Sequence, residues 1–559
     1  KQWSPLVFYD PARCILCYRC IRVCDEGLGV SALGLSFRGV SAEIIPNKGD
    51  HLECDECGWC IDVCPVGALT SGAYRYKSRP WEMNYVPAIC THCSNGCKTT
   101  LSVRNGEIIR ANNRDRSGIN GEFLCVKGRF GFDFVHSEER LQEPLIRKDG
   151  KLVPASWSEA LKFIAARVRE TIERNGKFAV IGSTRTTNEE NYYLQKFARL
   201  GLRTNNIDHH RSGDVITLID ALAGRKDALA TVNDLYACDA ALVLGADLAQ
   251  QHPLLAYQLR ANWRHHQAPV FVITPGPVRE DQYAARSLRA EAGTELGRLE
   301  ELREDLKARK NLVILYGASV KGEAVRRMVQ FGDSLGIPVR CVCLVDYVNS
   351  RGAMDMGLLP HLGPGYRPVE IPGMHLDAMM AAPDLDVIWV VGANPLEGGR
   401  EFAAKDAFVI VHELFLTETA QRADVVLPAM SLYEKNGTVT NVCGEVQRTK
   451  AGPKVMGTKS DLDILGLLAA QLGFDIGIPS HEKVFDEIRR TVRGYNVPLP
   501  VLATGGAAPA AVLNGNVPVD AQPDLVRSSG DTLFTSGTLG KYSKRLTQVM
   551  EAPGRLFQP

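Results

Sequence analysis

The sequence lacks several features that would assign a chain to a class at once. No stretch of 18 apolar residues occurs in its 559 positions, so it predicts no membrane-spanning helix. The formal net charge is only +1, which gives no basic field of the kind that binds nucleic acid. No G-x4-G-K-[ST] motif is present, and no G-x-G-x-x-G motif follows an apolar run. What remains is the composition of an ordinary globular protein, with 45% apolar and 23% charged residues, long enough for several domains.

The cysteines are the unusual feature. Twelve of the 16 lie within the first 125 residues, and the other four are scattered at Cys238, Cys341, Cys343 and Cys443. A disulfide framework is typical of small secreted domains, in which cysteines are spread through the whole fold. Crowding at one end of a large chain instead predicts metal binding.

Two cysteine runs have the same spacing, C-x2-C-x2-C-x3-C. The first is CILCYRCIRVC, and the second is CDECGWCIDVC followed by Pro65. This spacing is typical of two-cluster ferredoxins, in which the fourth cysteine of each run binds the other 4Fe–4S cluster. Zinc is the weaker alternative, because zinc knuckles usually take two cysteines each with longer gaps. The predicted ligand sets are Cys14, Cys17, Cys20 and Cys64 for cluster 1, and Cys54, Cys57, Cys60 and Cys24 for cluster 2.

A third group has a longer final spacing, C-x2-C-x3-C-x27-C, which predicts a separate small domain. Its members, the predicted ligands of cluster 3, are Cys90, Cys93, Cys97 and Cys125. His92 lies inside this loop, but four cysteines already complete the site, so we interpret it as a loop residue. Gly96 and Gly128 suit the tight turns that wrap backbone amides around sulfur. Three clusters joined by so little chain must lie near one another, and closely spaced redox centres form an electron-transfer wire.

The rest of the chain has the pattern of a parallel α/β sheet. Six short apolar runs each end in a glycine or a turn, at 178–183, 240–247, 269–276, 312–319, 387–395 and 408–413. Helical periodicity separates them, beginning with a segment that starts at Ser156 or Ser158 and ends at Gly176. The glycine turns are candidate nucleotide contacts, but we favour a purely geometric role, because no phosphate-binding motif accompanies them. Residues 501–515 predict an extended linker, and a basic tail follows that either packs against a neighbouring subunit or is poorly ordered.

The cluster motifs, together with VKGRFGFDFVHSEERLQEPLIRKDGKLVPASWSEAL, resemble the molybdopterin oxidoreductase superfamily. Within it, three further segments resemble the large iron–sulfur subunit, designated G, of bacterial NADH:quinone oxidoreductase (respiratory complex I). These segments are TNNIDHHRSGD, SRGAMDMGLLPHLGPGY and LPAMSLYEKNGTVTNVCGEVQR. The resemblance implies an α/β fold with four parts: a ferredoxin-like two-cluster domain at 1–78, a 4Fe–4S domain at 79–145, a molybdopterin-oxidoreductase-like body without metal at 146–455, and a helical segment, linker and tail at 456–559.

The resemblance also implies a function. The chain would carry electrons from a flavin-containing NADH dehydrogenase subunit toward quinone, beside other iron–sulfur subunits of the peripheral arm. It would have no independent catalysis, no nucleic-acid partner and no direct membrane span, and it would lie peripherally on the cytoplasmic side of the bacterial inner membrane. A pure scaffold is the third hypothesis, and it leaves the twelve patterned cysteines unexplained.

The sequence departs from this family in two respects. The large iron–sulfur subunit normally begins with a 2Fe–2S domain and a cluster held by one histidine and three cysteines, and neither is present. In addition, many complex I homologues keep only cluster 1, whereas cluster 2 is more typical of formate dehydrogenase alpha subunits, which makes such a subunit the alternative. Formate dehydrogenases bind molybdenum or tungsten through a Cys or selenocysteine at about residues 209–214, which here read HHRSGD. We therefore expect no molybdopterin, with Asp214 as the remaining ligand candidate, and Lys127 matches a lysine between cluster and pterin in the active enzymes.

Overall fold

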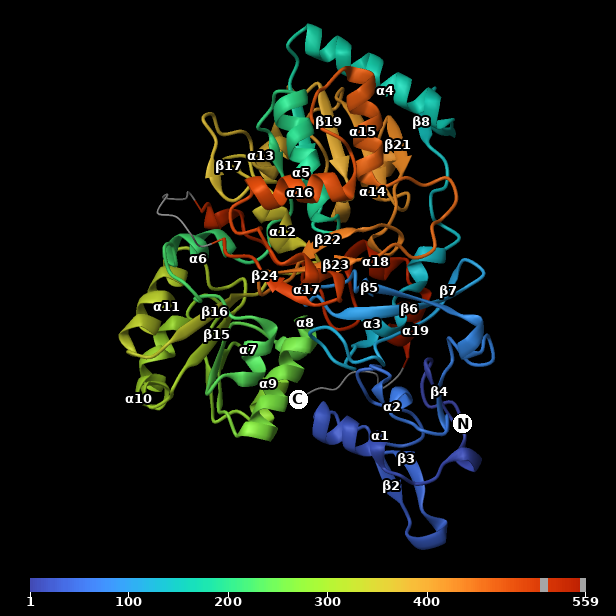
Figure 1. Ribbon diagram of the computed structural model, residues 1–559, viewed down its shortest axis with the longest axis vertical. Helices are drawn as coiled ribbons and strands as arrows, with labels where there is room; N and C mark the ends of the chain where they lie inside the picture. Colours follow the sequence, from blue (N-terminus) through green and yellow to red (C-terminus); the bar gives the residue numbers. More distant parts are fainter. Residues whose placement is uncertain (513–520, 553–559) are drawn as a thin grey trace. The chain divides into compact units, whose positions relative to one another are not determined.

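The computed structural model describes residues 1–512 and 521–552 (Figure 1). The chain divides into two compact units, each built from segments that are distant in sequence. Unit 1 comprises Lys1–Phe134, Asp227–Asp346 and Ser528–Pro559, and unit 2 comprises Val135–Lys226 and Tyr347–Arg527. Each unit is described by itself below.

The beginning of unit 1 is a small domain whose core is organised around sulfur. Strand β1 pairs antiparallel with β4, and β2 pairs antiparallel with β3. Trp3, Tyr9, Ile44 and Leu69 belong to a buried cluster against which most of the nearby cysteines pack. The elements are β1 (Val7–Tyr9), α1 (Arg19–Arg22), β2 (Leu33–Ser36), β3 (Glu43–Pro46), α2 (Trp59–Asp62) and β4 (Leu69–Ser71).

A three-stranded antiparallel sheet follows in unit 1, in the order β5-β6-β7. Two helices from the C-terminal part of the chain also belong to this unit, and the backbone N–H of Arg545 donates to Asp133 over 3.0 Å. The elements are β5 (Asn84–Ile89), β6 (Lys98–Arg104), β7 (Glu107–Asn112), α3 (Val126–Phe130), α18 (Gly537–Lys541) and α19 (Lys544–Glu551).

Unit 1 also contains a five-stranded parallel sheet in the order β14-β13-β12-β15-β16. Strands β12, β13 and β15 are buried along their whole length, as parallel strands covered on both faces must be. The elements are α7 (Val232–Ala237), β12 (Ala241–Leu244), α8 (Leu248–Gln251), α9 (Pro253–His266), β13 (Val270–Thr274), β14 (Arg286–Arg289), α10 (Arg303–Lys307), β15 (Leu312–Tyr316), α11 (Glu323–Ser334) and β16 (Val339–Cys343).

Unit 2 is built on a seven-stranded sheet in the order β11-β10-β19-β20-β21-β8-β9. Its first five strands are parallel, and the hairpin β8–β9 closes one edge antiparallel. These strands are β8 (Leu145–Lys148), β9 (Lys151–Pro154), β10 (Phe178–Ile181), β11 (Ile207–Asp208), β19 (Val387–Val391), β20 (Phe408–Glu413) and β21 (Val425–Pro428).

The remaining elements of unit 2 are a second, three-stranded sheet, a short hairpin and the helices. The sheet contains β22 (Gly437–Thr440), β23 (Glu445–Thr449) and β24 (Ala507–Pro509), and the hairpin pairs β17 (Leu362–Gly363) with β18 (Arg367–Pro368). The helices are α4 (Trp157–Glu173), α5 (Asn188–Lys196), α6 (Val215–Ala221), α12 (Ser350–Asp355), α13 (Leu376–Ala381), α14 (Glu418–Arg422), α15 (Asp461–Leu472), α16 (His481–Thr491) and α17 (Leu499–Ala503).

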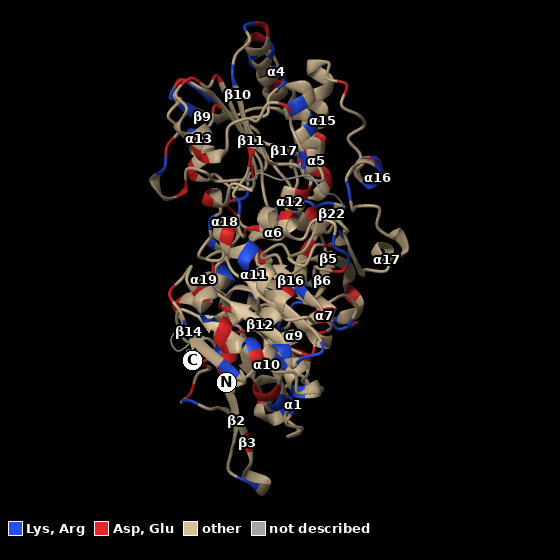
Figure 2. Ribbon diagram, turned by 90° about the vertical axis from the view of Figure 1, so that its left-hand side faces the viewer, with Lys and Arg blue, Asp and Glu red and all other residues tan. Residues whose placement is uncertain are grey.

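The α/β fold class predicted from the sequence is confirmed. All six apolar runs form parallel strands, although they are divided between the two parallel sheets. Ser156 is the N-cap of α4, because its hydroxyl accepts a hydrogen bond from the backbone of Glu159 at 3.2 Å. Lys and Arg are interspersed with Asp and Glu along the ribbon in Figure 2, as the net charge of +1 predicts. Among the described residues, no helix combines the length and apolar character needed to cross a bilayer.

The predicted linker at 501–515 is wrong in its described part. Helix α17 occupies its beginning, and β24 pairs antiparallel with β23 through Ala507, Ala508 and Pro509. Small residues misled the prediction, because they also suit an edge strand that packs closely on its neighbour. Residues 513–515 of that prediction, and residues 553–559 of the tail, lie outside the described part of the chain.

Candidate electron-transfer centre

The two ferredoxin-type cysteine runs have the same backbone conformation. In each run, the residues before and after the second cysteine have positive φ angles: Leu16 and Tyr18 in the first, Glu56 and Gly58 in the second. The second of these left-handed residues is followed by a short helix, α1 or α2, that carries the third cysteine. Such turns direct successive backbone N–H groups to one side, which is the arrangement that surrounds an anionic ligand.

Several of these N–H groups donate to cysteine sulfur. The backbone of Glu56 donates to Sγ of Cys54 at 3.3 Å, and that of Ala32 donates to Sγ of Cys24 at 3.3 Å. The backbone of Leu69 donates to Sγ of Cys64 at 3.5 Å. Amide hydrogen bonds to sulfur favour the thiolate form, which is the form that binds iron.

The structure brings together the four cysteines of each predicted ferredoxin-type set, including the exchanged fourth member. Cys14, Cys17, Cys20 and Cys64 line one cavity beside Tyr9, Ile44 and Pro65. Cys24, Cys54, Cys57 and Cys60 line a second cavity, whose other walls are mostly apolar and include Trp59. Nε1 of Trp59 is buried without a hydrogen-bond partner among the described residues, so this cavity offers an N–H donor to an acceptor such as sulfide.

The third set lies in the antiparallel part of unit 1. All four of its cysteines are buried, and Cys125 is the N-cap residue of α3. The thiols of Cys93, Cys90 and Cys125 lie close enough to Cys97 to add to the rise in its pKa that burial causes. Gly96 has a φ of 73°, and a Cβ on Gly128 would lie 3.5 Å from Sγ of Cys90, so both glycines stand where the chain wraps this group.

The ring of His92 contacts the backbone. Its Nε2 lies 3.0 Å from the carbonyl oxygen of Gly131, and the residue is 1% exposed. This contact supports the interpretation of His92 as a loop residue.

Burial dominates the electrostatics of the thiols. It raises the pKa of Cys20 to about 11 and that of Cys57 to about 12, and it raises the pKa of Cys54 and Cys60 well above the usual thiol range. Neighbouring cysteines of the same set add to these shifts. Buried thiols therefore need a metal centre to hold them as thiolates, since coordination deprotonates a thiol outright.

The donor sets fit cubic clusters. Within residues 1–512 and 521–552, no group of three or more His, Cys, Asp or Glu side chains has the compact arrangement that would hold a single metal ion. In a 4Fe–4S cluster each cysteine binds a different iron, so the four sulfurs stand around a larger object than one ion.

The three sets are neighbours within unit 1. Cys20 of the first set is close enough to Cys60 of the second to raise its pKa, after burial and the members of its own set. Cys57 of the second set and Cys125 of the third line one further cavity together with Phe123 and Tyr257. Phe123 stacks on Tyr257 with ring centroids 4.9 Å apart, and Trp59 meets Phe123 edge-on at 5.9 Å. Aromatic side chains therefore fill the space between the second and third sets.

Charged residues that the sequence did not single out surround this region. Arg279 forms two hydrogen bonds with Asp55, at 2.6 and 2.7 Å, between the ligand positions 54 and 57. Arg129 donates through Nε to the carbonyl oxygen of Cys57 at 2.6 Å. Arg129 lies in the quoted motif KGRFGF and was open to discovery, whereas nothing in the sequence links Arg279 to position 55.

Lys127 is held by the C-terminal segment of the chain. Its Nζ donates to the backbone carbonyl oxygens of Thr532 at 2.9 Å and Thr535 at 3.1 Å, and the residue is 3% exposed. Its positive charge also opposes the rise in the pKa of Cys125 that burial causes.

Residues 209–214 offer no thiol, and several of their polar groups are engaged within unit 2. Nδ1 of His209 lies 2.7 Å from the carbonyl oxygen of Leu358, and burial lowers the pKa of His209 to about 4. Arg211 forms two hydrogen bonds of 3.0 Å with Asp208. The carboxylate of Asp214 caps α6 by accepting from the backbone of Thr217 at 3.1 Å. This donor set does not fit a thiolate-bound molybdenum or tungsten, and the one carboxylate candidate serves as a helix cap.

The glycine turns of the five-stranded sheet are closed by protein atoms. Strand order reverses between β12 and β15, which is where such sheets bind nucleotides. A Cβ on Gly317 would collide with the backbone of Gly245, and one on Gly245 would collide with Ser319 and would lie 2.7 Å from Glu295. The two turns therefore need glycine for close packing of the backbone, which supports the geometric role favoured from the sequence.

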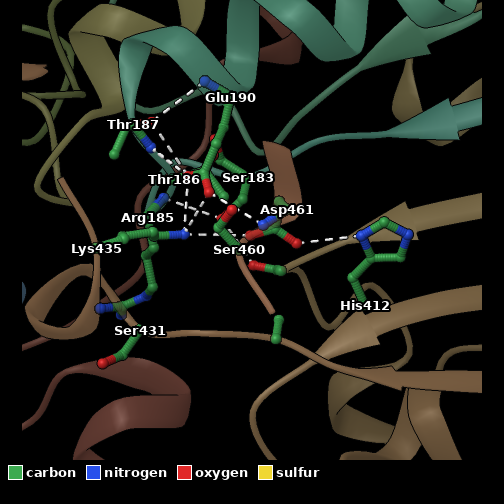
Figure 3. Close-up of polar contacts among 12 residues, drawn as sticks. Ser183, Arg185, Thr186, Thr187, Glu190, His412, Ser431, Lys435, Ser460 and Asp461 are labelled. Atoms are coloured by element: carbon green, nitrogen blue, oxygen red, sulfur yellow. Dashed lines mark hydrogen bonds and ion pairs between the residues drawn. The ribbon is translucent and has the colours of Figure 1, made fainter. Parts of the chain in front are cut away.

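A buried polar cluster occupies the carboxyl ends of the strands in unit 2 (Figure 3). Nζ of Lys435 lies 2.8 Å from Glu190 and 3.2 Å from Asp461, and Nδ1 of His412 lies 3.1 Å from the other oxygen of Asp461. Nε1 of Trp389 donates to Nε2 of His412 at 3.1 Å, so the ring is neutral and donates from Nδ1. Side chains of the protein thus fill a sheet edge where α/β proteins commonly bind ligands.

Comparisons with known proteins define the class. Residues 140–471 match the model of the molybdopterin oxidoreductase family, and residues 83–137 match its Fe4S4 domain. A solved structure, acetylene hydratase from Pelobacter acetylenicus, shares the fold with a TM-score of 0.54 at 13% identity, over 85% of this chain and 79% of that chain. The chain is a member of the molybdopterin oxidoreductase superfamily.

Within the superfamily, the chain belongs to the family of the large iron–sulfur subunit, designated G, of NADH-quinone oxidoreductase. Residues 4–70 match the ferredoxin-like domain of NADH-quinone oxidoreductase subunit 3. The chain is 32% identical to the second such G protein of NADH-quinone oxidoreductase from Rhizobium meliloti, over 98% of this chain and 74% of that protein. The alpha subunit of the F420-dependent formate dehydrogenase of Methanocaldococcus jannaschii is 29% identical, over 74% of each chain.

Proposed function

We propose that this protein is an electron-relay subunit of an NADH:quinone oxidoreductase. The observation that carries the proposal is the gathering of twelve patterned cysteines into three adjoining sets within one unit. The ligands of clusters 1, 2 and 3 are the three sets named above, each holding one 4Fe–4S cluster. When bound, these clusters supply one-electron transfer, and the protein holds them, orients them and excludes water.

The adjacency of the sets supports the order cluster 1, cluster 2, cluster 3. Cys60 adjoins the first set, and Cys57 shares a cavity with Cys125 of the third. Cluster 1 is the point of exchange with other subunits, because Cys14, Cys17 and Cys64 are partly exposed whereas every ligand of cluster 3 is buried. The exposed side chains of Ile15 (61%) and Tyr18 (40%) stand beside it for contact with a redox partner.

The assembly that we propose follows from the family. A flavin-containing NADH dehydrogenase subunit is the donor, and the other iron–sulfur subunits of the peripheral arm are the neighbours. The protein takes part without catalysis of its own and lies on the cytoplasmic side of the inner membrane. Molybdopterin is absent from the proposal, because residues 209–214 provide no thiol and Asp214 caps a helix.

The test uses the assembled complex with Cys17→Ser. Losing one thiolate perturbs or removes cluster 1, so NADH:quinone activity should collapse. NADH:ferricyanide activity at the flavin should survive, since it needs no onward wire. Cys238→Ser is the matched control, because Cys238 is a thiol of the same unit, 5% exposed, that belongs to none of the three sets. Full quinone reduction in a Cys17→Ser complex that lacks the cluster 1 signal by electron paramagnetic resonance (EPR) would overturn the proposal.

A catalytic alpha subunit of a formate dehydrogenase is the second candidate. The complete second set, Cys24, Cys54, Cys57 and Cys60, favours it, since that set is typical of those enzymes. Stoichiometric molybdenum or tungsten, or formate oxidation that is lost in Asp214→Ala, would establish this candidate and end the first.

A further inference from the structure

Arg129 is a buried charge placed between the second and third cysteine sets. It lies on α3, four residues after Cys125, and its side chain is 5% exposed. Nε donates to the carbonyl oxygen of Cys57 at 2.6 Å, and Nη1 pairs with Asp62, whose side chain is 8% exposed. A guanidinium on the element that begins at one set therefore binds the backbone of a ligand in the other.

The turn at Gly58 packs directly on this side chain. A Cβ on Gly58 would lie 2.5 Å from Cδ of Arg129 and 2.8 Å from the ring of Phe130. Gly58 also has a φ of 68°, which is unfavourable for other residues. Close packing fixes the guanidinium against the loop that carries Cys57 and leaves it little freedom to move.

One nitrogen of Arg129 has no partner in the described part of the chain. Nη2 is buried and makes no hydrogen bond to any described residue. A buried N–H without an acceptor loses its hydration and gains nothing in return, so such groups are rare unless a ligand completes them. Sulfide or thiolate sulfur is the acceptor that a bound cluster offers.

The charge of Arg129 acts on Cys57. Burial raises the pKa of Cys57, and the guanidinium of Arg129 opposes that rise. Arginine stays protonated throughout the range of protein pH, so its charge is fixed. A fixed positive charge favours whichever redox state carries the extra electron.

We propose that Arg129 is a positioning residue that raises the reduction potential of cluster 2 and holds its loop against the cluster 3 element. This inference rests on the proposed ligand set of cluster 2. Asp62 partly offsets the charge from one side, and the Asp55–Arg279 pair lies on the ligand loop itself. The reduced form of cluster 2 is thereby favoured next to the path toward cluster 3.

The test is a potentiometric titration of the full chain, purified anaerobically and followed by EPR. At about 10 Å and an effective dielectric constant of about 20, one charge changes a one-electron equilibrium by roughly tenfold, which is about 59 mV. Arg129→Gln should therefore lower the ratio of reduced to oxidised cluster 2 about tenfold at a fixed potential. Asp62→Asn should move that ratio in the opposite direction, because it removes the offsetting carboxylate.

Arg114→Gln is the matched control. Arg114 contacts the same carboxylate at 3.4 Å, but its side chain is 53% exposed, so solvent screens its charge and the ratio should stay within about twofold. A midpoint of cluster 2 that is unchanged in Arg129→Gln, or that shifts no more than that of cluster 1, would overturn the proposal. If Arg129→Gln loads no cluster 2, the direction of the Asp62→Asn shift decides. Neither readout needs NADH or quinone, so failure here is distinct from failure of the relay function.

Discussion

Replacing Lys435 by Met tests how the edge of the sheet in unit 2 is held closed. Lys435 is 5% exposed, and its ammonium pairs with two carboxylates, Glu190 and Asp461, which are 3% and 2% exposed (Figure 3). Although burial alone lowers the pKa of Lys435, the two carboxylates raise it above the usual lysine range, so the side chain is charged. Methionine keeps most of the volume and removes the charge, which leaves two carboxylates buried without their cation.

The expected loss is about 3–5 kcal/mol, the usual result of removing one partner of a buried charge network. At about 1.4 kcal/mol per decade, opening of unit 2 becomes roughly two to four decades more frequent. The loss should be smaller at pH 5 than at pH 8. Burial already raises the pKa of Glu190, and protonation of that carboxyl removes one of the two stranded charges.

Native-state hydrogen exchange at strands β10 and β20 measures this opening without requiring reversible unfolding of a large multidomain chain. Lys405→Met is the control, because Lys405 pairs with Glu401 on the surface, where the two side chains are 62% and 74% exposed, and no change is expected. A second variant, Lys435→Met with Glu190→Gln, should recover part of the loss. Exchange in Lys435→Met within about threefold of the wild-type rate at pH 8 would show that the network does not stabilise this edge.

Three further predictions concern the clusters and the pH dependence. Anaerobically purified protein should contain about 12 iron atoms per chain, and about eight, with the thiols of cluster 2 open to alkylation, would remove that cluster from the account. Gly58→Ala should lose about four irons, because its Cβ meets Arg129, whereas Gly67→Ala, which has a similar φ of 64° and no atom within 4 Å of the added Cβ, should lose none; equal iron in both variants would contradict the packing argument. Burial raises the pKa of Glu189 to about 7, so the stability it contributes is present below about pH 4.5 and is lost as pH rises through 7. Glu189→Gln should remove that loss, about 3 kcal/mol in the exchange of β22 between pH 5 and 8, and an unchanged slope would show that Glu189 does not titrate there.

The order of the chain differs from the order of the fold. The sequence predicted domains at 1–78, 79–145, 146–455 and 456–559, and these boundaries stay predictions. The compact units interleave, with Asp227–Asp346 and the C-terminal segment in the same unit as the cysteine sets. Local patterns hold no information on such pairing, because any parallel α/β segment can pack on several neighbours through similar apolar faces.

The cysteine spacing by itself determined the number of predicted sites and the exchange of the fourth ligands, because short gaps restrict which thiols can reach one another. Apolar runs that end in turns likewise determined the parallel strands, since burial on both faces demands continuous apolar sequence. Tertiary structure alone decided the partners of the charges. The contact of Arg279 with Asp55 joins positions 224 residues apart, and that of Lys127 with Thr532 joins positions 405 apart. A charge does not show its partner in the sequence, because the pairing depends on which surfaces pack, and the burial that makes it strong exists only after they have packed.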